Sequence, residues 1–451
     1  MTKFVDQLKN EFKVQDKNFY KIILMGLVVV FTLFVSFFNK YFVYVALALA
    51  VVSLFFIKGV KKIYLLIFLY PFYGVMRISY QDAVLMRTLV FVTFGLLLIE
   101  LVVDVVKNKK KLDYKILTLV SVISVYFLLP FGDYSIFRSL RLCASVGVLY
   151  FIWEYRHDLA FKELVFSLTY GLLLSCVLSP LVCCVPRLSD LIIKTPTQLK
   201  GFYRYSGLIE DPNYFGVKLI LSITLLNVLY RNKEINYFYW FMLVVVSCLG
   251  LLTLSKSFFI VFICYLLLAM LESFLKKDWK KALAYCIATI IIVSVCWACL
   301  NVFIRMMFNR LTGTGYGGSN ETLTNLTTGR SDLWVAYFTA CLSSVKNFLF
   351  GNGIGAQFLE TVSMTAAHNM YIEMLYLIGV VGFLLVFGTM LILFIKTSKK
   401  ENRKFVNFIP VICIAIILFS LNSFQAYRAY VLVVLLCFAM NYVKDKKPKT
   451  S

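Results

Sequence analysis

The sequence predicts an all-α fold, a polytopic transmembrane helical bundle of about 12–14 spans with one large loop outside the membrane. Hydrophobic residues make up 61% and charged residues 15% of the 451 positions, and the mean hydropathy is +0.83, which is too apolar for a soluble domain. Apolar stretches of roughly 15–25 residues recur, the length that a helix needs to cross ~30 Å of hydrocarbon. The alternating pattern of a membrane barrel is absent, so helices must satisfy the backbone in lipid.

Fourteen apolar stretches account for the predicted spans, and the third and the fifth are short. In chain order they cover 20–38, 41–57, 63–76, 86–104, 116–131, 138–153, 163–183, 214–230, 237–254, 257–274, 282–304, 370–395, 405–422 and 427–443. The segment before them is polar and carries lysines. No small-residue cleavage site follows it, so we expect the first span to act as its own insertion signal.

The apolar pattern has one long interruption, and it divides the chain. The predicted segments are a cytoplasmic N-terminal segment (1–19), a transmembrane bundle (20–304), a large extracytoplasmic loop (305–368), C-terminal transmembrane helices (369–443) and a cytoplasmic basic tail (444–451). A bundle with a single large polar excursion usually keeps its specific chemistry there.

The net charge of +23 is sorted along the chain as membrane topology requires. If the N-terminus is cytoplasmic and each span crosses once, the inner segments hold 30 of the 46 Lys and Arg residues. This positive-inside pattern predicts a multi-pass plasma-membrane protein with both termini in the cytoplasm. Because topology accounts for most of the basic excess, we predict no nucleic-acid partner.

Arginine and lysine are sorted differently from each other. The inner segments contain 27 Lys and 3 Arg, whereas the outer set contains 6 Lys and 10 Arg. Topology does not require this, but the planar fork of arginine binds phosphate or carboxylate with two hydrogen bonds. Arg138 and Arg141 are spaced i, i+3 and share a helix face, so an outer cavity could present them to a pyrophosphate or an acidic sugar. The alternative is that outer arginines reach to lipid head groups.

The 12 cysteines lie mostly inside apolar spans, where they serve as small packing residues. No Cys/His metal spacing and no disulfide framework is evident. The sequence therefore predicts no metal site.

The first unusual outer motif is GLIEDPNYFG, from Gly207 to Gly216. Asp211 suits the N-cap of a helix and Pro212 its first turn, so a simple helix start explains the pattern. The functional interpretation makes Glu210, Asp211 and Asn213 polar groups at the rim of a cavity. The preceding loop, which contains Arg204, is basic and aromatic, as a surface for sugars or lipid head groups would be.

Two further outer motifs each carry a cation. The TLSKS motif is a tight turn that places Lys256 at the membrane edge, where it either snorkels or contacts phosphate. The TTGRSDLW motif opens a helical pattern with Arg330 at its N-terminus. A cation at the positive end of a helix dipole is slightly unfavourable, which suggests that Arg330 has an anionic partner.

The last outer motifs are GNGIG, from Gly351 to Gly355, and the pair His368-Asn369. GNGIG lacks the strand and helix of a nucleotide loop, so a glycine turn explains it better. His368 is one of 2 histidines, and its imidazole titrates near neutrality. It is either structural at a helix start or a base that accepts a proton. His157 lies in a charged inner loop and is expected to be solvated.

The order of these motifs resembles that of the O-antigen ligase / Wzy polymerase superfamily of bacterial membrane glycosyltransferases. The resemblance covers roughly residues 200–385 and rests on GLIEDPNYFG, TLSKS, TTGRSDLW, GNGIG and HNMYIEMLYLIGVVG. It implies a GT-C-like fold and an enzyme that takes a glycan from undecaprenyl pyrophosphate at the outer face of the bacterial inner membrane. Neither a nucleotide sugar nor a metal or other cofactor is implied.

The resemblance also implies roles for individual residues. His368 would orient or deprotonate the acceptor hydroxyl, while Arg330 and Lys256 would bind the departing pyrophosphate. Lys256 stands where the family often has arginine, so a bidentate grip would be lost. The predicted further contacts to the glycan or its pyrophosphate are Arg204, Arg138, Arg141, Asn213, Asp211 and Asn369.

The leading expectation is a polymerase of lipid-linked repeat units for O-antigen, capsule or exopolysaccharide, working with a flippase and a chain-length regulator. A ligase of the same superfamily is the alternative. A lipid-linked-oligosaccharide flippase or polysaccharide exporter should show two related halves and no large outer loop. A plain solute transporter would need polar residues buried within the spans, and the sequence suggests few.

Overall fold

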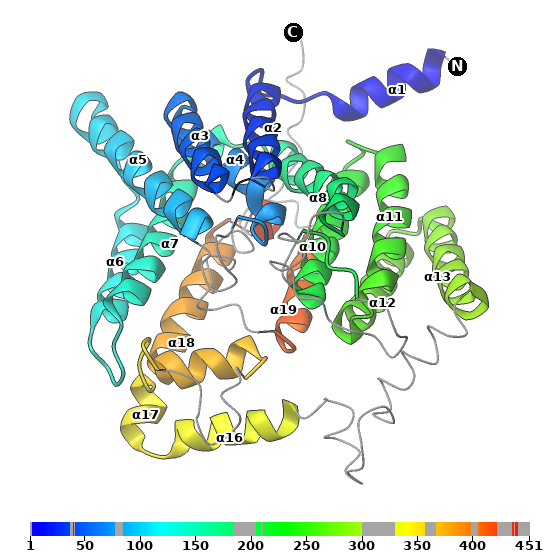
Figure 1. The fold of residues 1–451 in the computed structure, drawn as a ribbon. Helices are drawn as coiled ribbons and strands as arrows, with labels where there is room; N and C mark the ends of the chain where they lie inside the picture. The colour runs from blue at the N-terminus through cyan, green and yellow to red at the C-terminus, as the bar shows by residue number, and fades with distance from the viewer. Residues whose placement is uncertain are drawn as a thin grey trace.

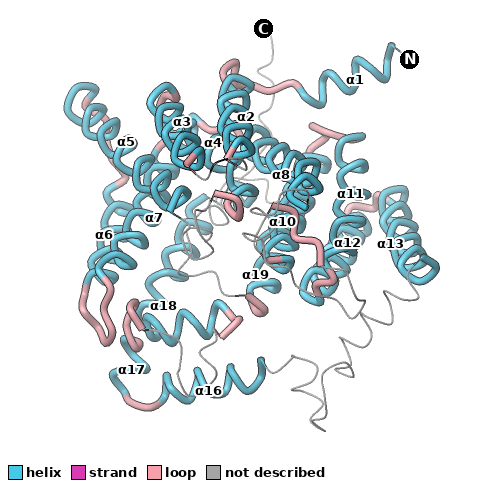
Figure 2. The backbone as a smooth tube through the Cα atoms, viewed as in Figure 1, coloured by secondary structure: helices cyan, strands magenta, loops and turns pink. Residues whose placement is uncertain are grey.

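The regular secondary structure that the computed structural model describes is helical, and Figure 2 shows these helices joined by loops. The described residues are 2–36, 39, 41–76, 84–183, 204–208, 211–299, 330–356, 367–397, 405–421, 435–436 and 438–440. No strand occurs among them. The all-α prediction is therefore confirmed for this part of the chain.

The N-terminal half begins with a short helix and continues with longer apolar ones (Figure 1). Its elements are α1 (Thr2–Phe12), α2 (Phe19–Val35), α3 (Phe42–Phe56), η1 (Gly59–Lys61), α4 (Lys62–Leu69), η2 (Tyr70–Phe72), α5 (Val84–Asn108), α6 (Tyr114–Leu128), α7 (Ile136–Glu154), η3 (Arg156–Asp158) and α8 (Phe161–Cys183).

The C-terminal half contains the helices that carry the outer motifs. They are α10 (Pro212–Arg231), α11 (Tyr237–Thr253), α12 (Lys256–Leu275), α13 (Trp279–Cys299), α16 (Arg330–Leu342), α17 (Val345–Phe350), α18 (Met370–Thr397), η4 (Phe405–Phe408) and α19 (Ile409–Leu418).

Six helices are long and apolar enough to cross a membrane. They contain Thr88–Asn108, Ile136–Glu154, Phe161–Pro180, Pro212–Arg231, Lys256–Leu275 and Met370–Thr389. Shorter apolar helices of 10–17 residues lie beside them. Each of the first thirteen predicted stretches falls on a helix, and most of the fourteenth lies outside the described residues. The described part of the chain thus has six candidate membrane-spanning helices, fewer than the predicted 12–14 spans.

The third predicted span is wrong as a single crossing. The α-helix there is α4, whose 8 residues extend only about 12 Å at 1.5 Å per residue. Pro71 follows within the 3₁₀ segment η2, and since proline lacks the N–H that continues a helix, the α-helix ends. The side chains of α4 are buried on all sides, and a Cβ at Gly171 of α8 would contact the Phe68 carbonyl. Close packing inside the bundle, rather than lipid, therefore surrounds this segment.

The bundle has two chemically different ends. At the end that carries α1, hereafter the α1 end, lysines pair with carboxylates between neighbouring helices. These pairs are Lys61–Asp16 (2.9 Å), Lys62–Glu100 (2.6 Å) and Lys110–Glu154 (3.7 Å). The other end, hereafter the α16 end, carries α16 and α17 (Figure 1). The arrangement separates the lysine-rich segments from the polar motifs.

Helix α10 lies at the centre of the bundle. Almost every side chain from Pro212 to Arg231 is buried, and α8, α11, α12 and α19 contact it. An apolar stretch without a polar face is typical of such a central helix. Because α10 begins at the α16 end, its N-terminal residues Asp211 and Asn213 lie in the middle of that end.

Helix α18 is broken at Gly379, where the backbone is left-handed (φ 61°, ψ −174°). The part before the break lies alongside α16, and the part after it turns into the bundle (Figure 1). A break inside an apolar helix leaves carbonyls that lipid cannot satisfy. Here Asn352 N donates to Tyr376 O (2.8 Å) and Gly353 N to Leu377 O (3.0 Å).

A third carbonyl at the break is satisfied by the hydroxyl of Tyr126 in α6, which donates to Ile378 O (2.6 Å). The GNGIG motif is thus a glycine turn, as predicted, but it is a turn built against the break in α18. Its opposite side pairs with the loop between α6 and α7, through Asp133 N to Asn352 O (2.8 Å) and Gly355 N to Asp133 O (2.7 Å). The loop therefore holds three parts of the chain together at the α16 end.

Candidate functional site

Three motifs that are far apart in the sequence meet at the α16 end. Asp211 precedes α10, Arg330 opens α16 and His368 precedes α18. The charges of Arg330 and Asp211 both act on His368, and the charge of Asp211 also acts on Arg330. Interactions between charges weaken with distance and with solvation. We therefore treat these three side chains as the centre of a candidate site.

His368 is held in an unusual backbone conformation and a partly buried environment. Its φ is 49°, in the left-handed region, immediately before the cap of α18. Burial lowers the pKa of His368 below its usual 6.5, the positive charge of Arg330 lowers it further, and Asp211 opposes both effects. The imidazole is consequently neutral at pH 7 and keeps one nitrogen able to accept a proton.

Arg330 links α16 to the end of α19. Its Nη1 donates to the carbonyl of Ser420 (2.8 Å), which uses one of the five N–H donors of the guanidinium. Burial lowers the pKa of Arg330, and the carboxylate of Asp211 opposes this effect. An arginine remains charged after such a shift. A fixed cation therefore lies at the N-terminus of α16, whose own dipole also favours anions.

Trp334, one turn after Arg330, positions the neighbour of His368. Its Nε1 donates to the carbonyl of Ala367 (2.9 Å). The two ends of the described part of the large loop are thus tied to each other next to the histidine. This contact fixes how α16 and the start of α18 lie relative to one another.

A second cluster joins the GLIEDPN and TLSKS motifs. Arg204 donates through Nε to Thr253 O (2.8 Å) and through Nη2 to Asn213 Oδ1 (2.9 Å). Ser255 Oγ donates to the same oxygen of Asn213 (2.9 Å). One amide oxygen therefore connects the segment before α10 with the turn between α11 and α12.

Asp211 completes the cluster as the N-cap of α10. Its Oδ1 accepts from Asn213 N (2.7 Å), the helix start that the sequence predicts, with Pro212 in the first turn. The same carboxylate acts electrostatically on His368 and Arg330. The helix cap and the functional interpretation of Asp211 are therefore compatible, because the cap orients a charge toward the site.

Lys256 opens α12 immediately after the tight turn, where Leu254 has a left-handed φ of 49°. Ser255 caps this helix by accepting from Phe258 N (3.3 Å) and also reaches Asn213. The residue is partly buried. The structure thus places Lys256 next to the Arg204–Asn213 cluster, and the role in binding pyrophosphate stays a prediction.

Arg138 and Arg141 both donate to backbone carbonyls. Arg138 Nη1 donates to Gly355 O (3.2 Å) and lies 3.5 Å from the carbonyls of Ile354 and Ala356, so it secures the GNGIG turn. Arg141 Nε donates to Phe137 O (3.3 Å) within its own helix. These contacts give Arg138 a structural role and bring neither arginine to His368.

Asn369 has a clear local role. Its Oδ1 accepts from Tyr371 N (3.0 Å) and Ile372 N (3.2 Å), so it is the N-cap of α18. Its side chain is buried. The contact to substrate that we predicted for Asn369 is untested, and the contact that the structure describes is a helix cap.

Two buried ionisable residues near the site were not expected from the sequence. Glu373 lies one turn into α18 with an exposed fraction of 7%, and its Oε2 has no hydrogen-bond partner among the described residues. Tyr214 in α10 interacts electrostatically with Glu373, Asp211 and Arg330. Glu373 therefore faces the same region as the three central residues.

Lys218 lies one turn further along α10 and is buried as well. Its ammonium lies over the rings of Tyr70 (4.5 Å) and Tyr73 (5.0 Å). The expectation of few polar residues within the spans was wrong, because Lys218 and Glu373 are buried inside apolar helices. An ionisable residue inside an apolar stretch is itself a signal of a site. That signal could have identified both Lys218 and Glu373.

Several predicted elements lie outside the described residues. Glu210 and most of the large loop, including Arg305, are among them. In the part of the chain that the structure describes, no group of three or more His, Cys, Asp or Glu residues is arranged to hold a metal ion.

Comparison with family models and curated proteins finds no relative of this chain. No protein-family model matches this chain, and a search of curated proteins finds no matching sequence. The geometry of the site and the order of the motifs are therefore the basis for a functional assignment.

Proposed function

We propose that the chain is a membrane glycosyltransferase of the O-antigen ligase / Wzy polymerase superfamily, and that it polymerises oligosaccharide repeat units carried on undecaprenyl pyrophosphate. The observation that supports this most is the meeting of Asp211, Arg330 and His368 at one end of the bundle. A neutral imidazole beside a fixed guanidinium suits a reaction in which a hydroxyl loses a proton and an anionic group leaves.

In the proposed reaction, the sugar hydroxyl of the acceptor attacks the anomeric carbon of the donor. The new C–O bond forms as the bond from this carbon to the pyrophosphate oxygen breaks, and undecaprenyl pyrophosphate leaves with the electron pair. His368 accepts the proton of the hydroxyl. Asp211 then favours the protonated imidazole, because its negative charge acts on His368 in that direction.

Arg330 and Lys256 are proposed to bind the pyrophosphate. Arg330 is fixed by Ser420 O, so its charge needs no rearrangement as the leaving group gains charge. Lys256 supplies a point charge rather than the paired N–H donors of an arginine. The cluster of Arg204, Asn213 and Ser255 positions the turn that carries Lys256.

The proposed setting is the bacterial inner membrane, with the lysine-rich α1 end in the cytoplasm and the α16 end outside. The positive-inside distribution of lysine supports this orientation. The GT-C-like architecture and the extracytoplasmic position of the loop belong to the same proposal. The donor and acceptor are lipid-linked oligosaccharides, and the expected protein partners are a flippase and a chain-length regulator of the same pathway.

A deletion strain complemented with the wild-type gene tests this function. A polymerase restores a ladder of surface polysaccharide lengths on a gel, while the deletion strain shows single-repeat material. If the deletion strain instead accumulates lipid-linked polymer that does not reach its acceptor or the cell surface, the protein is a ligase or an exporter. Wild-type ladders in the deletion strain would contradict a role in assembly altogether.

A further inference from the structure

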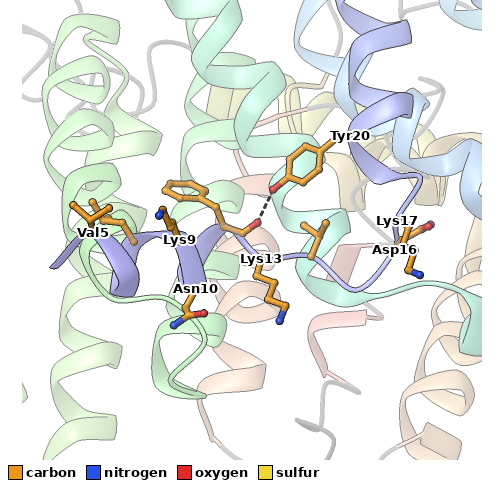
Figure 3. A pocket seen from close by; sticks show the side chains of 10 residues that line it. Val5, Lys9, Asn10, Lys13, Asp16, Lys17 and Tyr20 are labelled. Carbon is orange, nitrogen blue, oxygen red and sulfur yellow. Dashed lines mark hydrogen bonds between the residues drawn. The ribbon is translucent and has the colours of Figure 1, made fainter. Parts of the chain in front are cut away.

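The junction between α1 and α2 forms an open groove of about 770 Å³ at the α1 end. Figure 3 shows the side chains that line it. They are Val5, Leu8, Lys9, Asn10, Phe12, Lys13, Val14, Asp16, Lys17 and Tyr20. The groove lies at the opposite end of the bundle from His368 and Arg330, so the proposed reaction does not use it (Figure 1).

Helix α1 is fixed to the bundle. The carboxylate of Glu11 is buried and accepts from Tyr237 N and Phe238 N (3.0 Å each), so it caps the start of α11. The ring of Phe12 packs edge-on against Phe238 with centroids 5.2 Å apart and lies 6.1 Å from the ring of Phe166. The face of α1 that carries Glu11 therefore belongs to the protein interior, and the opposite face borders the groove.

The connector from α1 to α2 is equally well held. Lys162 Nζ donates to Lys13 O (2.8 Å), and Glu163 Oε1 accepts from Gln15 N (2.5 Å) and Asp16 N (3.1 Å). The hydroxyl of Tyr20 donates to Phe12 O (2.5 Å), closing the groove at its α2 side (Figure 3). Contacts within the protein therefore build the shape of the groove.

The lining separates into an apolar wall and a basic rim. The wall consists of Val5, Leu8, Phe12, Val14 and Tyr20. The exposed side chains of Lys9, Lys13 and Lys17 recur every fourth residue and form the rim. Asp16 does not neutralise them, because its carboxylate is paired with Lys61 (2.9 Å).

This combination matches one class of ligand. A phosphate head group would meet the lysines, and an acyl chain would cover the apolar wall, where the exposed fractions of Val5 and Tyr20 are 41% and 49%. Helix α1 lies across the end of the bundle, transverse to α2 and α11, as a helix in the plane of the membrane surface does (Figure 1). Basic segments at that depth attract anionic lipids.

We propose that the α1–α2 groove binds an anionic glycerophospholipid of the leaflet at the α1 end, with its phosphate on the Lys9–Lys13–Lys17 rim. Bound lipid fixes the depth at which α1 lies and therefore where the bundle sits in the bilayer. The inference depends on the helical membrane fold and is independent of the proposed glycosyltransferase activity.

Native mass spectrometry of the full-length protein, released from micelles containing equal amounts of phosphatidylglycerol and phosphatidylcholine, tests the proposal. The wild type should retain phosphatidylglycerol in preference, and the triple variant Lys9→Gln, Lys13→Gln, Lys17→Gln should lose that preference about tenfold or more. The matched control removes equal charge from exposed lysines of the same end, Lys107→Gln, Lys109→Gln, Lys111→Gln, and should keep the preference.

Two results would overturn the proposal. One is an equal loss of phosphatidylglycerol preference in the control variant, because a diffuse surface charge would then explain the binding. The other is an unchanged preference in the Lys9, Lys13 and Lys17 variant. A further arm uses sn-glycerol 3-phosphate, which carries the charge without the acyl chains. If it displaces the lipid at equal concentration, the groove is a site for a small soluble anion instead.

Discussion

Gly351 and Gly379 meet backbone to backbone where the GNGIG turn packs against the break in α18. A Cβ added to Gly379 would lie 2.5 Å from Gly351 N, and a Cβ added to Gly351 would lie 2.6 Å from Gly379 N. Both glycines have a positive φ, of 80° and 61°. The pair allows the first part of α18 to run along α16, and this direction brings His368 to Arg330.

Gly379→Ala should therefore destabilise the protein by several kcal/mol, on the order of 2–5, through backbone strain and displacement of the turn. The matched control is Gly388→Ala in the same helix, because no atom lies within 4 Å of a Cβ there. The control should change stability by less than ~1 kcal/mol. Thermal unfolding in detergent measures both variants, and equal midpoints would contradict this account of the break.

Asn213→Ala removes the single acceptor shared by Arg204 Nη2 and Ser255 Oγ. Removing one acceptor of the partly buried Arg204 guanidinium, which keeps its bond to Thr253 O, should cost about 1–3 kcal/mol of stability. It should also lower activity, since the turn that carries Lys256 is no longer held. The comparison variant is Asn108→Ala, whose side chain donates to Asp104 at an exposed position of the α1 end. Loss of activity in both variants alike would show that the Asn213 cluster has no special part.

Activity should depend on pH through His368. The reaction needs the neutral imidazole, and burial and Arg330 hold the pKa of His368 below 6.5, so the acid limb should lie below pH 6.5. Asp211→Asn removes the charge that raises this pKa, and it should move the acid limb to lower pH. Asparagine is an equally good N-cap, so α10 should remain intact. A rate profile from pH 4.5 to 8 measures the shift, and a limb that moves upward would contradict the sign.

Glu373→Gln should lower activity without lowering stability. A buried carboxyl group whose Oε2 has no partner among the described residues is costly, so an amide of the same shape should leave the unfolding midpoint unchanged or raise it. Glu272→Gln is the matched control, because this buried carboxylate pairs with Arg231 (2.7 Å) and Lys276 at the α1 end. It should lower stability and leave the activity per folded molecule unchanged. If Glu373→Gln instead lowered stability and left activity unchanged, Glu373 would be a structural residue only.

Much of the helical pattern was predictable, because apolar length alone decides whether a segment can be a buried or membrane-crossing helix. The exceptions depend on tertiary contacts. The sequence of 63–76 is apolar enough for a span, but Pro71 ends α4 and the bundle buries it from all sides. The break at Gly379 is stable only because Asn352, Gly353 and Tyr126 supply donors from elsewhere in the chain.

The candidate site was predictable in part for a similar reason. Alternating spans place the motifs of Asp211, Arg330 and His368 on one side, and their closeness follows from packing that no local pattern encodes. Polar side chains in these motifs serve either a ligand or the backbone, and the pattern cannot separate the two uses. Arg138 and Asn369 show this, since one secures a turn and the other caps a helix.

His368 and Arg330 are proposed to carry out glycosyl transfer from a lipid pyrophosphate. The most direct test uses purified protein in proteoliposomes with undecaprenyl-pyrophosphate-linked repeat units extracted from the native cell. The wild type and His157→Ala, which changes the other histidine, should convert them to longer lipid-linked chains and release undecaprenyl pyrophosphate. His368→Ala and Arg330→Ala should lose 10²-fold or more of this rate at equal folded amounts, about the range of a general base or of one oxyanion donor. Full activity in both variants, or no chain growth by the wild type, would contradict the claim.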